Sequence, residues 1–564
     1  MKPVKTRYTY HCMPMHLHAG HEPDRTRTQP GASMESHIYR ASQLGMRYIR
    51  ITDHDVRMGR KRCPADDFDF SRGMRQYKDA SGGELGWETE GSPVVSFDGT
   101  GMCLSASSAS EEWECSGVYF MSSGKRHTVS LLADVVLHLG LDFAPAVDTR
   151  LLLDVQLSQR PPEMTPAHLI YAFGDWQTDD PHSIVIPMTP SADGRYALNV
   201  SADAPVEKVG GKDNVFDTLR VVLATRRGAQ AHVRLDSLHI EHPYGFDEVL
   251  CRQRALAQTI GQRYGIKTFV TSEITGAGHH KNCFSSCVPC VDYEAWGYKI
   301  TQVEAAAHVK RHGGVFAYNH PFVKTETETM TPAQVSEIVA RYASEFIASR
   351  LWGAALMEVG FPMGRYGFAI GHYLQLWDLM SLAGVFITGY GDSDAHSSGA
   401  RGWFTGNNFA SWTAADADIP FPVPEEVFND SLQAGRLYMG DPVFLQGAVD
   451  FSAESGEPMG AVIPIKAGDN APRSMTLRVQ EAKPGWRMRI VVDGEETALM
   501  VLDGENVPDL AYSFEVSPTR VVSFARAELY SAEGRCIMVT NPIYLVKTDE
   551  YAGELPEARL YTEE

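Results

Sequence analysis

The sequence predicts an α/β barrel that is interrupted by one β-sandwich and followed by another. Helix-like stretches alternate with short apolar strands over residues 1–84 and 244–440, whereas residues 85–243 and 441–564 contain successive short strands separated by turn clusters. The length of 564 residues fits about three or four domains at roughly 150 residues each. We therefore expect one barrel in two parts, with a β-sandwich inserted and a second β-sandwich at the C-terminus.

The first barrel part, residues 1–84, begins with a strand-like run, TRYTYHCMPMHLH, and a helix-like stretch, SMESHIYRASQLGM. The β-rich segment RYIRITDHD follows, which completes the strand–helix–strand unit of a parallel sheet. Residues 85–243 then give short β runs such as TRLLLDVQLS and HSIVIPM, with turn clusters such as SADG between them. This spacing is typical of a β-sandwich.

The second barrel part, residues 244–440, repeats a helix-like stretch and an apolar strand four times. The strands are KTFVTSEIT, VFAYNHP, GAALMEVG and VFITGYGDSDAH, and each ends in polar residues. Buried parallel strands with reactive groups at their carboxyl ends are typical of α/β barrels. Residues 441–564 return to strands such as RMRIVVDG and RCIMVTNPIYLV, which predict the C-terminal sandwich.

The composition excludes several partners. The chain carries 51 Lys and Arg against 71 Asp and Glu, a net charge of −20, which argues against binding to a nucleic-acid backbone. No stretch approaches the roughly 18 consecutive apolar residues of a membrane helix. The N-terminus lacks the apolar region of a secretory signal, and nine cysteines show no disulfide-scaffold pattern. We expect a cytoplasmic protein with a small-molecule substrate and no nucleic-acid or membrane partner. The oligomeric state stays open.

Five strand ends carry residues that can bind metals. Residues two apart on a strand point to the same side, so His16 and His18 can reach one ion, as can Asp394 and His396. The other strand ends hold Thr52-Asp53-His54-Asp55, Ser272-Glu273 with His279 and His280 shortly after, and Asn319-His320-Pro321. His, Asp and Glu are the ligands expected for Zn, Mn or Fe. Together the five strand ends predict a site with several metal ions that activates water.

The same motifs support a family resemblance. HLH, ITDHD, SEIT with a following GHH, AYNHP and GDSDAH resemble, in this order, the motifs of the PHP (polymerase and histidinol phosphatase) superfamily. LQAGRLYMGDP and ARAELYSAEGRCIMVTNPIYLV resemble the C-terminal portion of the branch with carbamate-hydrolase-like metalloenzymes. The resemblance covers the chain except the insert at 85–243. It implies a distorted (β/α)7 barrel with two or three divalent ions (Zn, Mn or Fe).

The resemblance also implies ligands for three ions. The first ion would be held by His16, His18, Glu273 and Asp394. The second would share Glu273 and add His320, with His279 as a further candidate. The third would be held by His54, His396 and a residue of the loop after His18.

The loop after His18 departs from the family pattern, because it reads HAGHEPD where HxHT followed by Ser and an acidic residue or His is usual. His21 and Asp24 are both candidates for the third ion, and Asp24 is favoured. Asp53 and Asp55 are expected to orient His54 rather than bind metal. Asp392 is either such a supporting group or an alternative to Asp394.

The predicted function is a metal-dependent hydrolase, with a phosphoester as the default substrate. Carbamate or carboxylic ester hydrolysis on a carbohydrate-derived or other small molecule is the alternative. Glu273 would bridge two ions, and His320 or His54 would protonate the leaving group. Arg401 is a candidate for binding an anionic group, and Trp403 for lining a substrate pocket.

Two rival functions belong to other classes. Cys283, Cys287 and Cys290 have the spacing of the iron–sulfur site of radical S-adenosylmethionine enzymes, with structural zinc or free thiols as further possibilities. The ends of the insert resemble jelly-roll modules, which favours a carbohydrate ligand that Trp87, Trp113 and Trp176 would stack against. A glycan-binding protein with an inert barrel is therefore the second rival.

Overall fold

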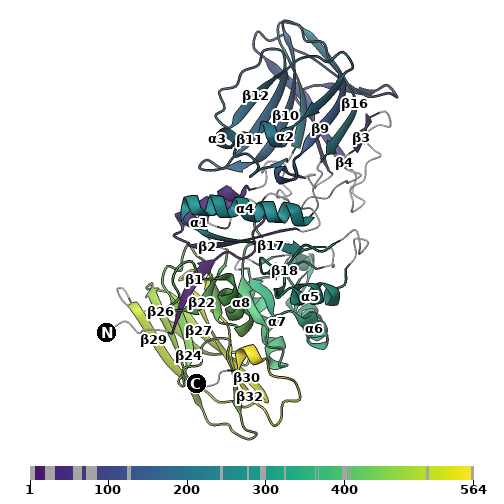
Figure 1. Cartoon of the computed structure of the whole chain (residues 1–564). Helices are drawn as coiled ribbons and strands as arrows, with labels where there is room; N and C mark the ends of the chain where they lie inside the picture. The colour runs from purple at the N-terminus through teal and green to yellow at the C-terminus, as the bar shows by residue number, and fades with distance from the viewer. Residues whose placement is uncertain are drawn as a thin grey trace.

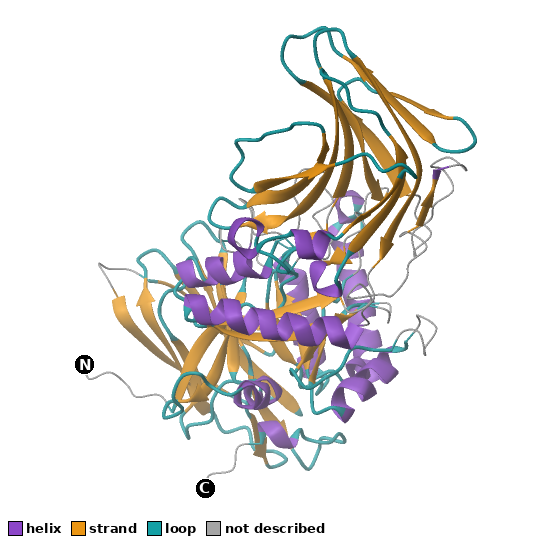
Figure 2. Ribbon diagram, turned by 45° about the horizontal axis from the view of Figure 1, so that its top comes forward, coloured by secondary structure: helices purple, strands orange, loops and turns teal. Residues whose placement is uncertain are grey.

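The computed structural model describes residues 7–19, 32–54, 67–70, 85–122, 129–216, 218–241, 246–275, 279–292, 300–322, 325–361, 364–365, 367–396, 403, 406, 408–502 and 507–560. Strands make up 42% of the structure and helices 22%. Most of the helices lie in the middle of the molecule, with the inserted strands at one end and the C-terminal strands at the other (Figures 1 and 2). No helix in the described ranges is long and apolar enough to cross a membrane.

The predicted (β/α)7 barrel, and the TIM-like architecture that it implies, is wrong: the described strands form several separate sheets and no such barrel. One six-stranded sheet combines parallel and antiparallel pairs. Its strands in order are β2 (Tyr48–His54), β17 (Lys267–Ile274), β18 (Lys281–Phe284), β19 (Val315–Tyr318), β20 (Leu356–Gly360) and β21 (Thr388–Gly391). The short strand β18 is the physical reason for the mixed order, because it turns back from β17 and pairs antiparallel with both neighbours.

The first strand departs from the expectation as well. β1 (Tyr8–Met13) does not join the six-stranded sheet but pairs antiparallel with β22 (Ala410–Asp416), which in turn pairs with β23 (Leu437–Gly440). β23 then pairs with β31 (Cys536–Thr540) near the C-terminus. The first and last parts of the chain therefore share one nine-stranded sheet.

The other strands of this nine-stranded sheet are β30 (Val522–Tyr530), β27 (Arg487–Val492), β28 (Glu495–Val501), β25 (Val462–Ile465) and β32 (Ile543–Lys547). A three-stranded sheet of β24 (Val449–Ala453), β26 (Arg473–Ala482) and β29 (Val507–Val516) accompanies it. One hydrophobic core contacts both sheets, with Phe451 and Leu477 from the small one and Ile490 and Leu529 from the large one. The expectation of a separate C-terminal sandwich fits only in part, because the large sheet continues into β1.

The insert forms two six-stranded sheets that share one hydrophobic core, to which Leu153 and Leu169 contribute from one sheet and Leu139 and Leu235 from the other. The first sheet contains β12 (Ser183–Met188), β11 (Thr165–Phe173), β10 (Thr149–Arg160), β15 (Thr218–Thr225), β7 (Glu114–Ser122) and β4 (Leu85–Glu90). The second contains β13 (Arg195–Leu198), β9 (Val136–Asp142), β16 (Gln230–Glu241), β6 (Met102–Ser107), β5 (Val94–Phe97) and β3 (Asp67–Asp69). Because β3 pairs with β16, the sandwich includes residues that lie before position 85.

Two of the long helices begin at capping boxes. α5 (Gln302–Arg311) and α6 (Pro332–Ser349) both begin at capping boxes, in which Thr301 and Thr331 accept a backbone N–H of the first turn. The remaining helices of eight residues or more are α1 (Met34–Gln43), α4 (Phe246–Tyr264), α7 (Ile370–Leu382) and α8 (Glu425–Ala434). α1 and α4 lie between the inserted sandwich and strands β2 and β17 (Figure 1).

Candidate metal centre

Backbone contacts join four chain segments that carry predicted site residues. His16 and His18 follow β1, and Leu17 between them forms a β-bridge with Ala395. The carbonyl of Leu17 also accepts a hydrogen bond from Thr52 N in β2 at 2.9 Å. β2 and β17 pair in parallel with His54 opposite Glu273. These contacts bring the imidazoles and carboxylates of the four segments together at one end of the sheet.

Four side-chain atoms form the first group. His16 Nε2 lies 3.1 Å from His18 Nε2, 3.2 Å from Glu273 Oε1 and 3.2 Å from Asp394 Oδ1. His18 Nε2 lies 2.8 Å from Asp394 Oδ1. Two donors that are each about 2.1 Å from one zinc ion at a tetrahedral angle stand about 3.4 Å apart, so this spacing fits a shared ion. The four residues are the set that the resemblance implied for the first ion.

Two further groups adjoin the first. His54 Nδ1 lies 2.7 Å from Glu273 Oε2, and His280 Nδ1 lies 3.2 Å from the same oxygen. His54, His18 and His396 form the third group, with the His396 and His54 Nε2 atoms 3.5 Å apart. Within the sets of His16, His18 and Glu273, of His54, Glu273 and His280, and of His18, His54 and His396, one ligand atom per residue lies within 4.8 Å of the others. The structure therefore contains histidine–carboxylate clusters that could hold metal ions.

His280, rather than the expected His279, contacts Glu273. The ring of His279 packs 5.4 Å from that of Tyr318, and its carbonyl accepts a hydrogen bond from Lys281. His280, which the resemblance left out, contacts Glu273 instead. No metal-capable group among the described residues contains His279. Spacing within GHH alone could not distinguish the two.

His320 stands slightly apart from the three groups. Its Nε2 lies 3.7 Å from Glu273 Oε1, and its side chain is 9% exposed. Its backbone has φ +25°, outside the usual regions for a residue with a side chain. Glu358, in the middle of β20, holds that conformation by accepting the His320 N–H at 2.6 Å. His320 is therefore a buried imidazole beside Glu273.

Supporting residues include several that the sequence interpretation missed. Glu358 also contacts His16 Nδ1 at 3.2 Å, which orients that ring. Asn319 donates to Glu273 Oε1 at 2.6 Å, and its own Oδ1 accepts from Tyr390 at 2.8 Å. Glu358 is the middle residue of the strand LMEVG, so the strand-end rule did not reach it; the one signal was a carboxylate inside an otherwise apolar strand.

Asp53 and Asp392 both accept backbone N–H groups. Asp53 accepts the Ala19 N–H at 2.6 Å and a bond from Gln253 of α4, which fixes the chain just after His18. Asp392 accepts the Met15 N–H. Burial raises the pKa of Asp392 well above its ordinary value. Asp394 is the aspartate whose carboxylate contacts the imidazoles of His16 and His18.

The pKa shifts of Glu273 and His18 favour the forms that bind a cation, whereas that of His16 does not. Burial alone would lower the pKa of His16, but the carboxylates of Asp394, Glu273 and Glu358 outweigh it and raise the pKa well above its ordinary value. Burial alone would raise the pKa of Glu273, but attraction to His280, His16 and His54 outweighs it and lowers the pKa well below its ordinary value. The pKa of His18 is lowered by burial and by the neighbouring imidazoles of His396 and His54. A charged carboxylate and a neutral imidazole are the forms that bind metal.

Arg365 adds a cation at the edge of the centre. It forms an ion pair with Asp394 and lies over the ring of Phe361 at 5.2 Å. Its side chain is 24% exposed, so a ligand from solvent can reach it. Sequence reasoning missed this residue, because no motif marks it.

The structure does not test four of the predicted residues, because His21, Asp24, Asp55 and Arg401 fall outside the described residues. Trp403 is 2% exposed within a hydrophobic core, and its indole N–H donates to His37 Nδ1 at 3.1 Å. This packing favours a structural role for Trp403 over substrate contact.

The described residues give no support to an iron–sulfur site at the three cysteines and little to sugar stacking on the tryptophans of the insert. Cys283 and Cys290 are buried, Cys287 is exposed, and no metal-capable group among the described residues includes any of them. Trp113 packs against Trp176 with ring centroids 6.0 Å apart. Two arginines of the insert lie over the Trp113 ring at 4.8 and 4.4 Å, which leaves less of that ring for a sugar.

Comparisons with known proteins add little. No protein-family model and no curated protein matches the chain. A family 12 xyloglucanase from Bacillus licheniformis matches at 8% identity and a TM-score of 0.21, over 31% of this chain and 92% of the xyloglucanase. A CARDB domain from Pyrococcus furiosus matches at 10% identity and a TM-score of 0.14, over 18% of this chain and 96% of that domain. Scores this low carry no argument about function.

Proposed function

We propose that the chain is a metal-dependent hydrolase of phosphoesters that shares the metal-binding motifs of the PHP superfamily. One observation carries the proposal: the buried carboxylate of Glu273 is shared by two of the three donor groups, and His18 and His54 are also each shared by two. Overlapping groups of this kind suit two or three adjacent divalent ions. Bound ions would supply Lewis acidity and an activated water for hydrolysis.

The side chains of the centre have separate tasks in this proposal. Glu273 would bridge two ions through its two oxygens, each of which faces a different imidazole. His54 lies within two donor groups, so it is committed to metal binding. His320 lies 3.7 Å from Glu273 and belongs to none of the three donor groups of the described residues, so it is better placed than His54 to protonate the leaving oxygen.

Arg365 favours an anionic substrate. Its guanidinium neutralises Asp394, and a phosphate bound beside the ions would face the same group. A neutral carboxylic ester would gain little from this cation. Phosphoester hydrolysis is therefore the function that the arrangement supports best.

The test is a comparison of substrates and variants. The purified protein, loaded with Mn²⁺ or Zn²⁺, is assayed on p-nitrophenyl phosphate, a p-nitrophenyl carboxylic ester and a carbamate. We expect phosphate release that chelator removes, and an Arg365→Met loss of at least about tenfold in kcat/KM on the phosphoester alone. Equal losses on all three substrates, or turnover of the carboxylic ester only, would overturn the proposed substrate class.

A further inference from the structure

Helix α1 lies between the inserted sandwich and the metal centre, and the insert supplies part of its cap. Asp213 of the insert accepts the Met34 N–H at 2.9 Å through Oδ1 and the Glu35 N–H at 3.0 Å through Oδ2. The hydroxyl oxygen of the N-cap residue, Ser33, accepts the Ser36 N–H at 3.1 Å. The first N–H groups of a helix have no partner within it, and a carboxylate there also interacts favourably with the helix dipole. Two of these bonds therefore come from the insert.

Arg160 secures Asp213 in this position. It lies at the end of β10, is 7% exposed, and binds Asp213 Oδ2 through Nη1 at 2.8 Å and Glu35 through Nη2. A Cβ at Gly210 would come within 2.1 Å of the guanidinium carbon of Arg160, so this position accepts no side chain unless Arg160 moves. The insert and the first turn of α1 are thus joined by a buried ion-pair network.

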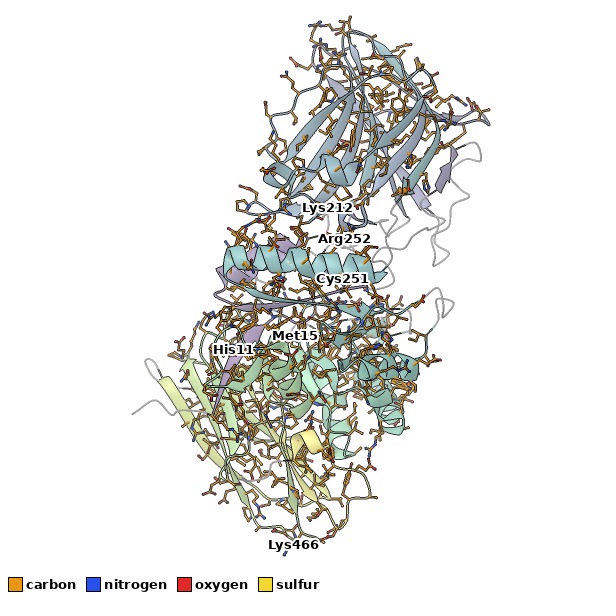
Figure 3. All side chains as sticks on the ribbon, viewed as in Figure 1. His11, Met15, Lys212, Cys251, Arg252 and Lys466 are labelled. Atoms are coloured by element: carbon orange, nitrogen blue, oxygen red, sulfur yellow. The ribbon has the colours of Figure 1, made fainter. Side chains whose placement is uncertain are left out.

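α4 takes part in the same junction. Arg263 Nη1 and the Tyr264 hydroxyl, both on α4, bind Glu35 at 2.5 and 2.9 Å. On the insert side, Asp134 pairs with Lys212 and also with Arg252 of α4, the latter at 3.1 Å. Figure 3 places the labelled Lys212 and Arg252 where the sandwich meets α4.

The same segment reaches the metal centre at two points. His37, one turn into α1, lies 3.0 Å from the carbonyl of His18 through its Nε2. Trp403 donates to His37 Nδ1, and an indole nitrogen is always a donor, so Nε2 carries the proton and donates to His18. Ala32, just before the helix, donates its N–H to the carbonyl of His396 at 3.1 Å and forms a β-bridge with Gln159 of the insert.

We propose that Asp213 and Arg160 are positioning residues for the metal centre. They fix the start of α1, and residues 32–37 in turn fix the backbone of His18 and His396, two members of the third donor group. The described residues of the insert contribute no donor to any group, and the effect that we propose for them is indirect. The inference rests on the proposed metal centre and not on the reaction that the centre performs.

Metal affinity, measured with Zn²⁺ alone against a competing chelator, is the direct readout. Asp213→Ala removes both caps, and we expect it to weaken binding on the order of tenfold, at the lower end of the effects seen for groups behind metal ligands. Asp213→Asn keeps the shape and one acceptor, so it should recover part of that loss. If zinc affinity falls in Asp213→Ala but the wild-type protein hydrolyses no phosphoester, the proposed function is wrong and this inference stands.

Asp154 provides the matched control. It is a buried aspartate of the same insert, paired with Arg220 and His168 at 2.8 Å each, and has no contact with α1. Asp154→Asn should lower the stability of the insert and leave zinc affinity within about twofold of wild type. An equal loss of affinity in this control would overturn the inference, because any damage to the insert would then suffice.

A double-mutant cycle tests the route through α1. His37→Phe removes the bond to the His18 carbonyl at the other end of the route. If Asp213 acts through α1, the losses of zinc affinity from Asp213→Ala and His37→Phe should combine to less than their product. Fully multiplicative losses, or wild-type affinity in Asp213→Ala, would overturn the inference.

Discussion

Substituting Gln for Glu273 tests the shared ligand of the centre. Glu273 is fully buried, and Asn319 donates to its Oε1 at 2.6 Å. A glutamine must keep its carbonyl oxygen toward this donor, so its amide nitrogen takes the place of Oε2. That nitrogen would face His54 at 2.7 Å and His280 at 3.2 Å, where it has no lone pair to offer a metal.

The expected loss follows from this geometry. The variant loses one negative charge and one oxygen donor shared between two groups. The new amide N–H would also donate a hydrogen bond to a ring nitrogen of a neighbouring histidine, and that nitrogen could then not bind a metal. Groups behind metal ligands change affinity by about 10- to 100-fold, so removal of a ligand should cost at least about 100-fold, or roughly 3 kcal/mol. We expect less than one retained ion per chain after gel filtration and no measurable turnover, with the circular dichroism spectrum unchanged.

A second buried glutamate serves as the control. Glu528 is also fully buried, but it binds Arg526 and the Tyr530 hydroxyl in the C-terminal sheet. Glu528→Gln should lower the melting temperature and leave metal content and turnover as in wild type. Wild-type metal content and turnover in Glu273→Gln would refute the assignment of the shared ligand.

Three further outcomes follow from the structure. Glu358→Gln should weaken metal binding by about 10- to 100-fold, because this group orients two of the proposed ligands; unchanged affinity in chelator competition would contradict that role. Joint replacement of Cys283, Cys287 and Cys290 by Ser should leave metal content and hydrolysis unchanged, whereas loss of iron and sulfide on elemental analysis would reveal a separate cysteine site. Burial lowers the pKa of His37 to about 4, so the unfolded chain takes up a proton between pH 7 and 5 that the folded chain refuses. Metal-free protein should lose about 2 kcal/mol of stability over that interval through this residue, and His37→Phe should remove this part of the loss in denaturant titrations.

The strand-end rule found much of the candidate centre from the sequence. Alternation on a strand places His16 and His18 on one side, and parallel pairing places His54 opposite Glu273, so local pattern and neighbouring strands suffice there. Loop residues were harder, because both His279 and His280 follow the strand by a similar distance. Only the packing of Tyr318 against His279 decides which imidazole reaches Glu273.

Sheet partners of distant strands could not be predicted from local pattern. An apolar strand such as β1 satisfies its backbone equally well beside β2 or beside β22, and the choice of β22 depends on contacts more than 390 residues away in the chain. The antiparallel strand β18 is only four residues long, with no periodicity that would announce it. These two strands account for the difference between the expected barrel and the observed sheets.

The metal content of the native protein tests the central claim most directly. The protein is expressed with Zn²⁺ and Mn²⁺ supplied, freed of loose metal by gel filtration, and measured by elemental analysis, with anomalous diffraction to locate the ions. The account predicts two or three divalent ions per chain, with at least two of them bound by Glu273. Absence of stoichiometric metal, or ions located only away from His18, His54 and Glu273, would contradict it.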